Sequence, residues 1–335
     1  NRNIGNRIMS KLEVDQIDPQ SGTTLTLGTS GDTVVVPSGV SLAPGGGLTL
    51  TGALVVDGGT VKLDGNYPTG SNNVALGDTA LDSVEAGGTN NVAIGDNAGT
   101  AITTGDNNVA VGKDALLANT TAANNVAVGK DALLANTTGC ENVAVGAKAL
   151  DANTIGHYNT AVGYDSLSSN TEGNYNTAVG CNALKLNTTG ETNIAVGSNS
   201  LDANTTGVSN VALGFASLGA NTTANDNTAV GSKSLQLNTT GTRGVAVGFE
   251  SLKANTTGYG NIGVGYAALT ANTTGGDNVA VGIQALDANT TASNNVAIGS
   301  SALSANTTGT ENVSVGRCAL ASNTTASYNT AVGFE

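Results

Sequence analysis

Few side chains in this sequence could carry out acid–base or nucleophilic chemistry. The 335 residues include a single histidine, His157, and three cysteines, Cys140, Cys181 and Cys318. The cysteines are odd in number, fall at unrelated positions and show no CxxC spacing, so we expect free thiols. His157 falls in a stretch expected to form a corner, without a plausible ligand partner. Neither residue type indicates a catalytic centre, which needs acid, base or nucleophile groups that converge in a pocket.

The charged side chains show no arrangement typical of a reactive site either. Pairs such as Lys113-Asp114 and Lys130-Asp131, and the single Lys148, occupy variable positions that we expect at corners and outward faces. Cleavage of a glycosidic bond would need two carboxylates roughly 5 to 9 Å apart, with aromatic side chains nearby, and the sequence shows no such set. We therefore expect no catalytic, cofactor-binding or metal-binding residues and no enzymatic activity.

Two functions of known repeat proteins can be compared directly with the pattern. Calcium-binding repeats need units of the type Gly-Gly-x-Gly-x-Asp, and the units here contain no invariant Asp. An ice-binding face would need outward Thr-x-Thr ranks, whereas the Thr pairs here are adjacent, as in Thr205-Thr206, and fall in a corner. We expect neither calcium nor ice as a ligand.

Composition and charge limit the partners and the shape. The 25 acidic and 12 basic side chains give a formal net charge of −13, which would repel a nucleic acid backbone. No apolar run approaches the roughly 20 residues that span a bilayer, so we expect no membrane insertion. Aromatic residues are 3% of the chain while Gly contributes 47 residues, so large core side chains are scarce. The apolar residues must then be used along a line, which favours an elongated molecule.

One glycine position repeats along most of the chain and sets its organisation. From Gly95 to Gly333 this Gly recurs every 17 residues without exception, and the interval before it, from Gly77, is 18. A period that tolerates no insertion is typical of stacked coils, in which each residue has a counterpart directly above and below. The sequence therefore predicts a β-solenoid of 17-residue coils.

The residues before each repeated Gly predict a short strand. The residue directly before Gly is Val, Ile or Leu, the residue two earlier is β-branched, and between them lies Ala, Gly or Ser. This alternation places the two aliphatic positions on one face of a strand and the small residue on the other. We expect the aliphatic positions to face the core, so that Val179 and Leu184 point inward within one coil while Lys185 points outward.

The second half of each unit predicts a second short strand and a second corner. A Leu follows nearly every Gly by four residues, as at Leu116 and Leu184, with Gly99 as an exception, and the unit then turns through Asn-Thr-Thr-Gly, as at Asn136 to Gly139. A helix over the Ala-Leu-x-Ala stretch is the alternative, but 17 residues leave little room for a strand, a helix and two turns. Two strands per coil are therefore expected.

Asparagine recurs at two fixed places in the unit. One Asn stands three residues before the aliphatic residue that directly precedes the repeated Gly, in 15 of 16 units, with Gly244 as the gap. A second Asn stands at the second corner, from Asn119 to Asn323. Stacked amides can hydrogen-bond along the axis as ladders and satisfy polar groups at the corners. We interpret these residues as scaffold.

Three segments are expected. Residues 1–20 form an N-terminal attachment arm, in which Met9 to Gln20 is the expected docking element; residues 21–70 form a β-rich fibre segment without the 17-residue period; residues 71–335 form the solenoid. The fold class is thus all-β, with an elongated parallel β-solenoid preceded by a short β-rich segment. Fifteen coil steps at roughly 4.8 Å each predict a rod of about 70 Å.

The sequence resembles a known group of fibre proteins. KLEVDQIDPQSGTTLTLGTSGDTVVVPSG, at Lys11 to Gly39, resembles the opening of tail-fibre proteins of marine and cyanobacterial phages, and the NNVAVGKDALLANTTG units look like the repeat arrays of such fibres. NVAVG and NVAIG are similar to the NSVAIG motif of trimeric autotransporter adhesin heads, which are homotrimers of left-handed parallel β-rolls. The resemblance covers nearly the whole chain and implies a homotrimeric fibre.

The resemblance implies a structural function in attachment. The chain would be the shaft of a phage tail fibre on the virion surface, joined to tail or baseplate proteins through its N-terminus, and its host-receptor-binding tip would lie beyond Glu335. The alternatives are a bacterial surface adhesin stalk and the body of a tailspike enzyme. In the homotrimer we expect the small strand residue at the contact between chains, at Ala161, Ala178, Ala195, Ala212 and Ala229.

Overall fold

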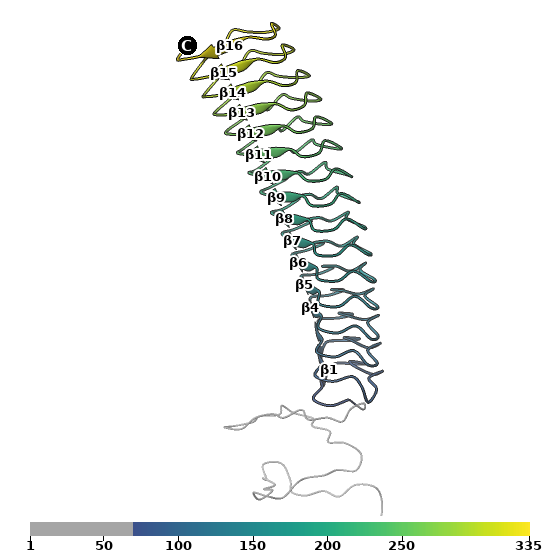
Figure 1. Ribbon diagram of the computed structural model, residues 1–335. Coiled ribbons are helices and arrows are strands. Elements are labelled where there is room, and N and C mark those ends of the chain that lie inside the picture. The colour runs from purple at the N-terminus through teal and green to yellow at the C-terminus, as the bar shows by residue number, and fades with distance from the viewer. Residues whose placement is uncertain (1–69) are drawn as a thin grey trace, which may run out of the picture. The chain divides into compact units, whose positions relative to one another are not determined.

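The computed structural model describes residues 70–335, which form a parallel β-solenoid (Figure 1). Each coil contributes one three-residue strand, and every strand pairs in parallel with the next in a single sheet of order β1 to β16. The strands are β1 (Val74–Leu76), β2 (Val92–Ile94), β3 (Val109–Val111), β4 (Val126–Val128), β5 (Val143–Val145), β6 (Thr160–Val162), β7 (Thr177–Val179), β8 (Ile194–Val196), β9 (Val211–Leu213), β10 (Thr228–Val230), β11 (Val245–Val247), β12 (Ile262–Val264), β13 (Val279–Val281), β14 (Val296–Ile298), β15 (Val313–Val315) and β16 (Thr330–Val332). The predicted all-β solenoid is confirmed for this part of the chain. The predicted arm at 1–20 and the β-rich segment at 21–70 lie outside the described residues, apart from Gly70.

The stacking register follows the sequence period without a slip. In the pairing of β7 with β8, for example, Ala178 lies opposite Ala195 and Val179 opposite Val196, each 17 residues further along. The single 18-residue interval is absorbed between β1 and β2, where Val74 still lies opposite Val92. Equivalent residues therefore form columns that run along the axis of the solenoid.

The second predicted strand does not form, and the prediction of two strands per coil is wrong. The Ala-Leu stretch is a succession of turns, and no helix forms there or elsewhere in residues 70–335, so the helical alternative is also excluded for this region. Its backbone still bonds to the next coil, since Leu184 N–H donates to Ser200 O at 2.9 Å and Leu186 N–H to Asp202 O at 3.0 Å. Left-handed residues in this stretch prevent the regular extended geometry of a strand.

Those left-handed residues are mostly not glycines. In one coil Asn182 has φ of 56° and Leu184 has φ of 52°, and the same two positions are left-handed in most other coils. An L-residue in this conformation costs roughly 1 to 2 kcal/mol. Burial of a Leu side chain contributes about 1.5 to 3 kcal/mol, and bonds to the neighbouring coils add to it, so the stack holds a conformation that a single coil would not adopt.

The glycine after each strand is required by both conformation and space. Gly180 has φ of +134°, and a Cβ at this position would lie 2.7 Å from the carbonyl carbon and oxygen of Gly197 in the next coil. L side chains rarely adopt this φ, and the close approach of two backbones leaves no room for a methyl group. This corner explains why the Gly recurs without exception.

The small residue at the centre of each strand points into the coil. Ala178 and Ala195 are completely buried, whereas Val196 retains 37% of its exposure and Ile194 retains 41%. The prediction of which strand face is buried is therefore wrong, since Val179 lies on the outer face. The predicted inward position of Leu184 is confirmed. Because the small residues lie inside their own coil, the predicted placement of Ala161, Ala178, Ala195, Ala212 and Ala229 at a contact between chains is also wrong.

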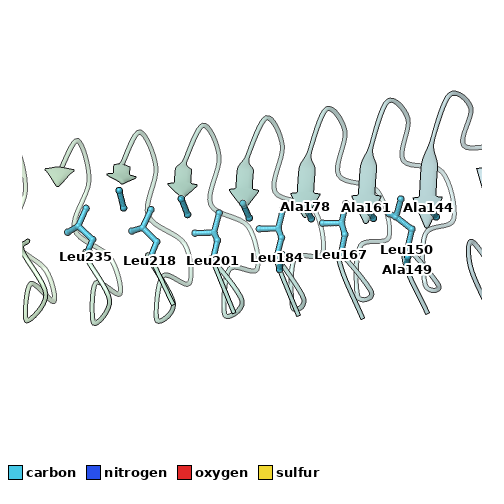
Figure 2. Close-up of a cluster of buried hydrophobic side chains, with 14 of the residues drawn as sticks. Ala144, Ala149, Leu150, Ala161, Leu167, Ala178, Leu184, Leu201, Leu218 and Leu235 are labelled. Carbon is cyan, nitrogen blue, oxygen red and sulfur yellow. The ribbon is translucent and has the colours of Figure 1, made fainter. Parts of the chain in front are cut away.

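The interior is narrow and consists largely of three rows of side chains, namely the strand alanines, the leucines, and the Ala or Ser directly before each Leu. Figure 2 shows the strand alanines, such as Ala161 and Ala178, beside the leucines, such as Leu167 and Leu184. A methyl group from one side and a Leu side chain from the other fill the space, which leaves no room for a Val on the inner face of the strand. The alanine column is interrupted at Gly263, where the hydroxyl of Ser251 donates to the Gly263 carbonyl at 2.9 Å, and at Ser314, whose own hydroxyl donates to Ala319 O at 2.6 Å.

Two buried asparagine ladders hold the corners, as the sequence predicts. In the first, Asn193 Nδ2 donates to Asn176 Oδ1 at 3.2 Å and to Gly207 O at 2.8 Å, and its backbone N–H also donates to Asn176 Oδ1. In the second, Asn204 Nδ2 donates to Asn187 Oδ1 at 2.8 Å and to Gly207 O at 3.0 Å. Each amide thus satisfies polar groups of two coils, which would otherwise be buried without partners.

Gly244 interrupts the first ladder, and restoring the amide is expected to stabilise this coil. Elsewhere each Asn accepts from the backbone N–H of the Asn in the next coil, but Asn261 N–H has no acceptor within the described residues because Gly244 has no side chain. Gly244→Asn should supply that acceptor and slow hydrogen exchange at the Asn261 amide about 5- to 10-fold, as expected for a gain of roughly 1 kcal/mol.

Gly244→Ala is the matched control for this substitution. A Cβ at Gly244 would lie 3.1 Å from Asn227 Oδ1 and 3.3 Å from a Leu235 methyl, a fit that the Asn residues of the other units achieve. Ala meets the same contacts without supplying an acceptor, so it should leave exchange at Asn261 fast. Equal protection in both variants would show that the amide is not the cause.

Candidate functional surface

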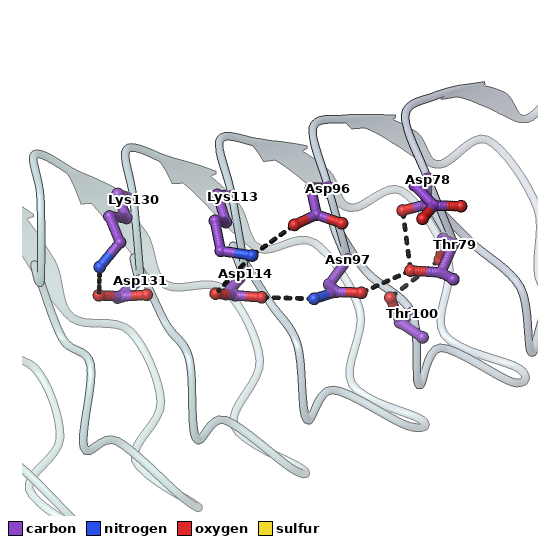
Figure 3. Close-up of polar contacts among 9 residues, drawn as sticks. All are labelled: Asp78, Thr79, Asp96, Asn97, Thr100, Lys113, Asp114, Lys130 and Asp131. Atoms are coloured by element: carbon purple, nitrogen blue, oxygen red, sulfur yellow. Dashed lines mark hydrogen bonds and ion pairs between the residues drawn. The ribbon is translucent and has the colours of Figure 1, made fainter.

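The charged pairs identified in the sequence form surface ion pairs within and between coils (Figure 3). Lys113 pairs with Asp96 of the preceding coil, and Lys130 pairs with Asp131 of its own coil at 2.8 Å. Their hydrogen bonds to these carboxylates raise the pKa of both lysines above the ordinary value. Surface pairs of this kind contribute little to stability.

Three partly buried aspartates are the strongest candidates for acid–base groups. Burial raises the pKa of Asp151, Asp202 and Asp287, each of which follows an interior Leu by one residue. Asp151 and Asp202 are 51 residues apart, which is three coils or about 14 Å, and Asp287 is five coils further along. They are too far apart to act as the paired carboxylates of a glycosidase.

Asp151 has one other carboxylate near it, but that group is already paired. Asp165 contributes to the raised pKa of Asp151 by charge repulsion. The Asp165 carboxylate in turn forms an ion pair with Lys185 at 2.9 Å. The arrangement balances charge on the surface of adjacent coils and does not leave a free acid–base pair.

His157 lies in a column with Cys140 and Asn174, which the sequence reasoning missed. Its Nδ1 accepts the backbone N–H of Cys140 at 2.9 Å, and its own backbone N–H donates to Asn174 Oδ1 at 2.7 Å. The Cys140 thiol instead contacts Thr138 O and Ala123 N–H, both at 3.5 Å. The ring therefore bridges coils, and the 17-residue spacing of the three residues was the signal that could have revealed the column.

Two aromatic pairs also arise from the 17-residue spacing and were not predicted. Tyr158 and Tyr175 stack with ring centroids 4.9 Å apart, and Phe249 and Tyr266 stack at 5.8 Å. All four rings are substantially exposed. They are surface ladders between adjacent coils.

Residues 70–335 contain no disulfide bond and no cluster of metal ligands. The three cysteines are unpaired, and within residues 70–335 no three His, Cys, Asp or Glu side chains gather as metal ligands would. In the same region there is no helix with the length and apolar character needed to cross a membrane.

The outer face of the sheet is the most extensive apolar feature of the described structure. We call the first and third residues of each strand the outer aliphatic columns. In all sixteen strands these positions hold only Val, Ile, Leu or Thr, and many of them are more than a third exposed, for example Val196, Leu213 and Val230. A parallel sheet is ordinarily covered on both faces, and apolar surfaces of this extent are typical of contacts with other molecules.

Comparison of the chain with protein-family models and with curated proteins found no match in either case.

Proposed function

We propose that the protein is the shaft of a phage tail fibre, assembled as a parallel homotrimer whose chains pack through their outer aliphatic columns. The observation that carries the proposal is the apolar outer face, which runs along sixteen strands without one charged residue. A second copy of the chain offers a surface of the same chemistry with the same axial repeat, so that side chains of two copies can interdigitate over the whole length. The contact thus moves from the small residues to the Val, Ile and Thr positions beside them.

The stacking of coils in register supports a shaft, because it gives the solenoid a uniform cross-section without an internal break. The interior side chains pack the coils and the corner asparagines form ladders. In this proposal the protein therefore serves as a spacer of fixed length that joins other proteins at its two ends. In this proposal residues 1–20 join tail or baseplate proteins and a distal tip contacts the host receptor, on the surface of the virion. The similarity of NVAVG to adhesin heads makes a bacterial surface stalk the second candidate.

Charged substitutions on the outer face should dissociate the assembly. Light scattering of the wild-type chain should give about 98 kDa, three times its 32.7 kDa. Val196→Lys combined with Leu213→Lys would bury unpaired charges in every contact, which costs several kcal/mol, and should shift the mass to that of one chain.

The control carries the same charges at the Asn-Thr-Thr corners of the same two coils. Thr206 and Thr223 are exposed, so Thr206→Lys with Thr223→Lys should leave the trimer intact. A wild-type monomer, or an unaltered trimer in the outer-face variant, would contradict the proposed contact.

Electron microscopy distinguishes the two candidate locations. Antibodies against the repeats should decorate rods that project from the tail of the phage particle, with a solenoid length of about 70 Å for fifteen steps. Decoration of a bacterial envelope instead would contradict the tail-fibre proposal and favour the adhesin stalk.

A further inference from the structure

One hollow on the turn side of the solenoid has the chemistry of a small binding site. Its volume is about 420 Å³, within the range of ligand pockets, and it spans three consecutive coils around Gly219. None of its lining residues belongs to a strand, so it is separate from the outer aliphatic columns.

The hollow exists because Gly219 lacks a side chain. Gly219 stands five residues after the corner Gly, a position held by Asp202 in the coil before and by Gln236 in the coil after. In no other repeat of the sequence is this position Gly. A Cβ here would lie 3.4 Å from Asp202 Oδ1 and from Ala216 O, which is ordinary contact, so the gap is not imposed by backbone strain.

Polar groups with unused hydrogen-bonding capacity line the hollow. Asn199 accepts a bond from Asn182 at 3.1 Å through Oδ1, which leaves its Nδ2 without a partner among the described residues. Gln236 also lines the hollow, and its side-chain amide has no hydrogen-bond partner within residues 70–335. Asp202 contributes a half-buried carboxylate whose pKa is raised by burial. The site therefore offers both donors and acceptors across a short span.

Phe215 and Leu237 supply the apolar part of the lining. Phe215 is 51% exposed and, unlike Phe249 and Tyr266, makes no ring–ring contact in the described part of the chain. Its counterparts in the coils before and after are Ser198 and Ser232, which are too short to cover an aromatic ring. A flat apolar surface thus stands beside the polar groups.

We propose that this hollow binds one pyranose unit of a neutral saccharide. A sugar ring has C–H faces that pack on an aromatic side chain and hydroxyl edges that both donate to a carboxylate and accept from amides. An apolar peptide side chain would leave Asp202, Asn199 and Gln236 unpaired, and a phosphate group would be repelled by Asp202. The site goes beyond the proposed shaft function, which does not depend on it.

Saturation-transfer NMR on the full chain tests the site with the methyl pyranosides of glucose, galactose, mannose and N-acetylglucosamine. Each probe is used at about 10 mM, because a shallow single-sugar site should bind in the millimolar range. At least one of them should receive saturation from the wild-type protein. Gly219→Thr should reduce the signal about 10-fold, because Thr fills the hollow; the same column holds Thr100 and Thr270 in other coils, so the fold tolerates it.

Two further variants separate the site from general effects on the solenoid. Phe215→Ser, which reproduces the Ser found in the adjacent coils, should also abolish the signal. Ser304→Thr introduces Thr at the equivalent position of a distant coil and should leave the signal unchanged. The proposal is overturned if none of the four probes binds the wild type, or if binding survives in Gly219→Thr or Phe215→Ser; either result would leave the rod and its oligomeric state, and hence the shaft proposal, untouched.

Discussion

Leu184→Asp is expected to unfold its coil and the contacts it makes with the coils on either side. The Leu184 side chain is completely buried between interior leucines and alanines, so a carboxylate there would be desolvated without a partner. We expect a loss of about 4 kcal/mol or more, at the upper end of single-residue effects. Since each coil contacts only its neighbours, the damage should be centred on β7 and β8. Hydrogen exchange of those strands measures it.

Lys185→Ser provides the control at the next residue. Lys185 points outward and forms an ion pair with Asp165 at 2.9 Å, on the surface of the coil. The pair is only partly exposed, since the Lys185 side chain retains 38% and the Asp165 side chain 13% of its exposure. Its removal should cost about 1 kcal/mol, well below the loss expected for Leu184→Asp, and Ser occupies the same position at Ser168 and Ser304. If both variants lost protection to the same extent, the assignment of interior and exterior in this half of the coil would be wrong.

Ala195→Gln is expected to be the second most damaging change, although Ala is the smallest side chain involved. Ala195 is completely buried and faces the interior leucines, so Gln would both overpack the coil and bury an unpaired amide. Overpacking costs about 1 to 3 kcal/mol and an unsatisfied amide about as much again. Amide protection of β7, β8 and β9 should fall, whatever the oligomeric state.

Val196→Gln, one residue further along β8, should behave in the opposite way. Val196 lies on the outer face, where a polar side chain can remain hydrated in a single chain. Protection within the coil should stay near that of the wild type while self-association weakens. The inward direction of the alanine column would be refuted if Val196→Gln disrupted the coil and Ala195→Gln affected only assembly.

The opposite effects expected at Ala195 and Val196 test which face of the strand is the interior, which the sequence analysis assigned wrongly. Alternation in a strand shows that the small and aliphatic residues lie on opposite faces, but it does not show which face is the interior. Larger apolar residues are more often buried, and this tendency predicts that the Val side chains point into the coil. The backbone of the coil instead leaves space for only a methyl group opposite Leu184, and the β-branched residues are left on the face that we propose is covered by a second chain.

The sequence alone determined the features that depend on strict repetition. The 17-residue spacing implied coils in register, the repeated Gly implied a corner that excludes a side chain, and the repeated Asn implied ladders, because a stack imposes the same local demand on every unit. Only the tertiary structure decided the features that depend on how far apart the walls of a coil lie and on what stands above and below a given residue. The missing second strand, the inward alanines and the hollow at Gly219 belong to this second kind. Their physical cause is packing across one coil, as between Ala178 and Leu184, and contact between neighbouring coils, which the pattern of a single unit does not display.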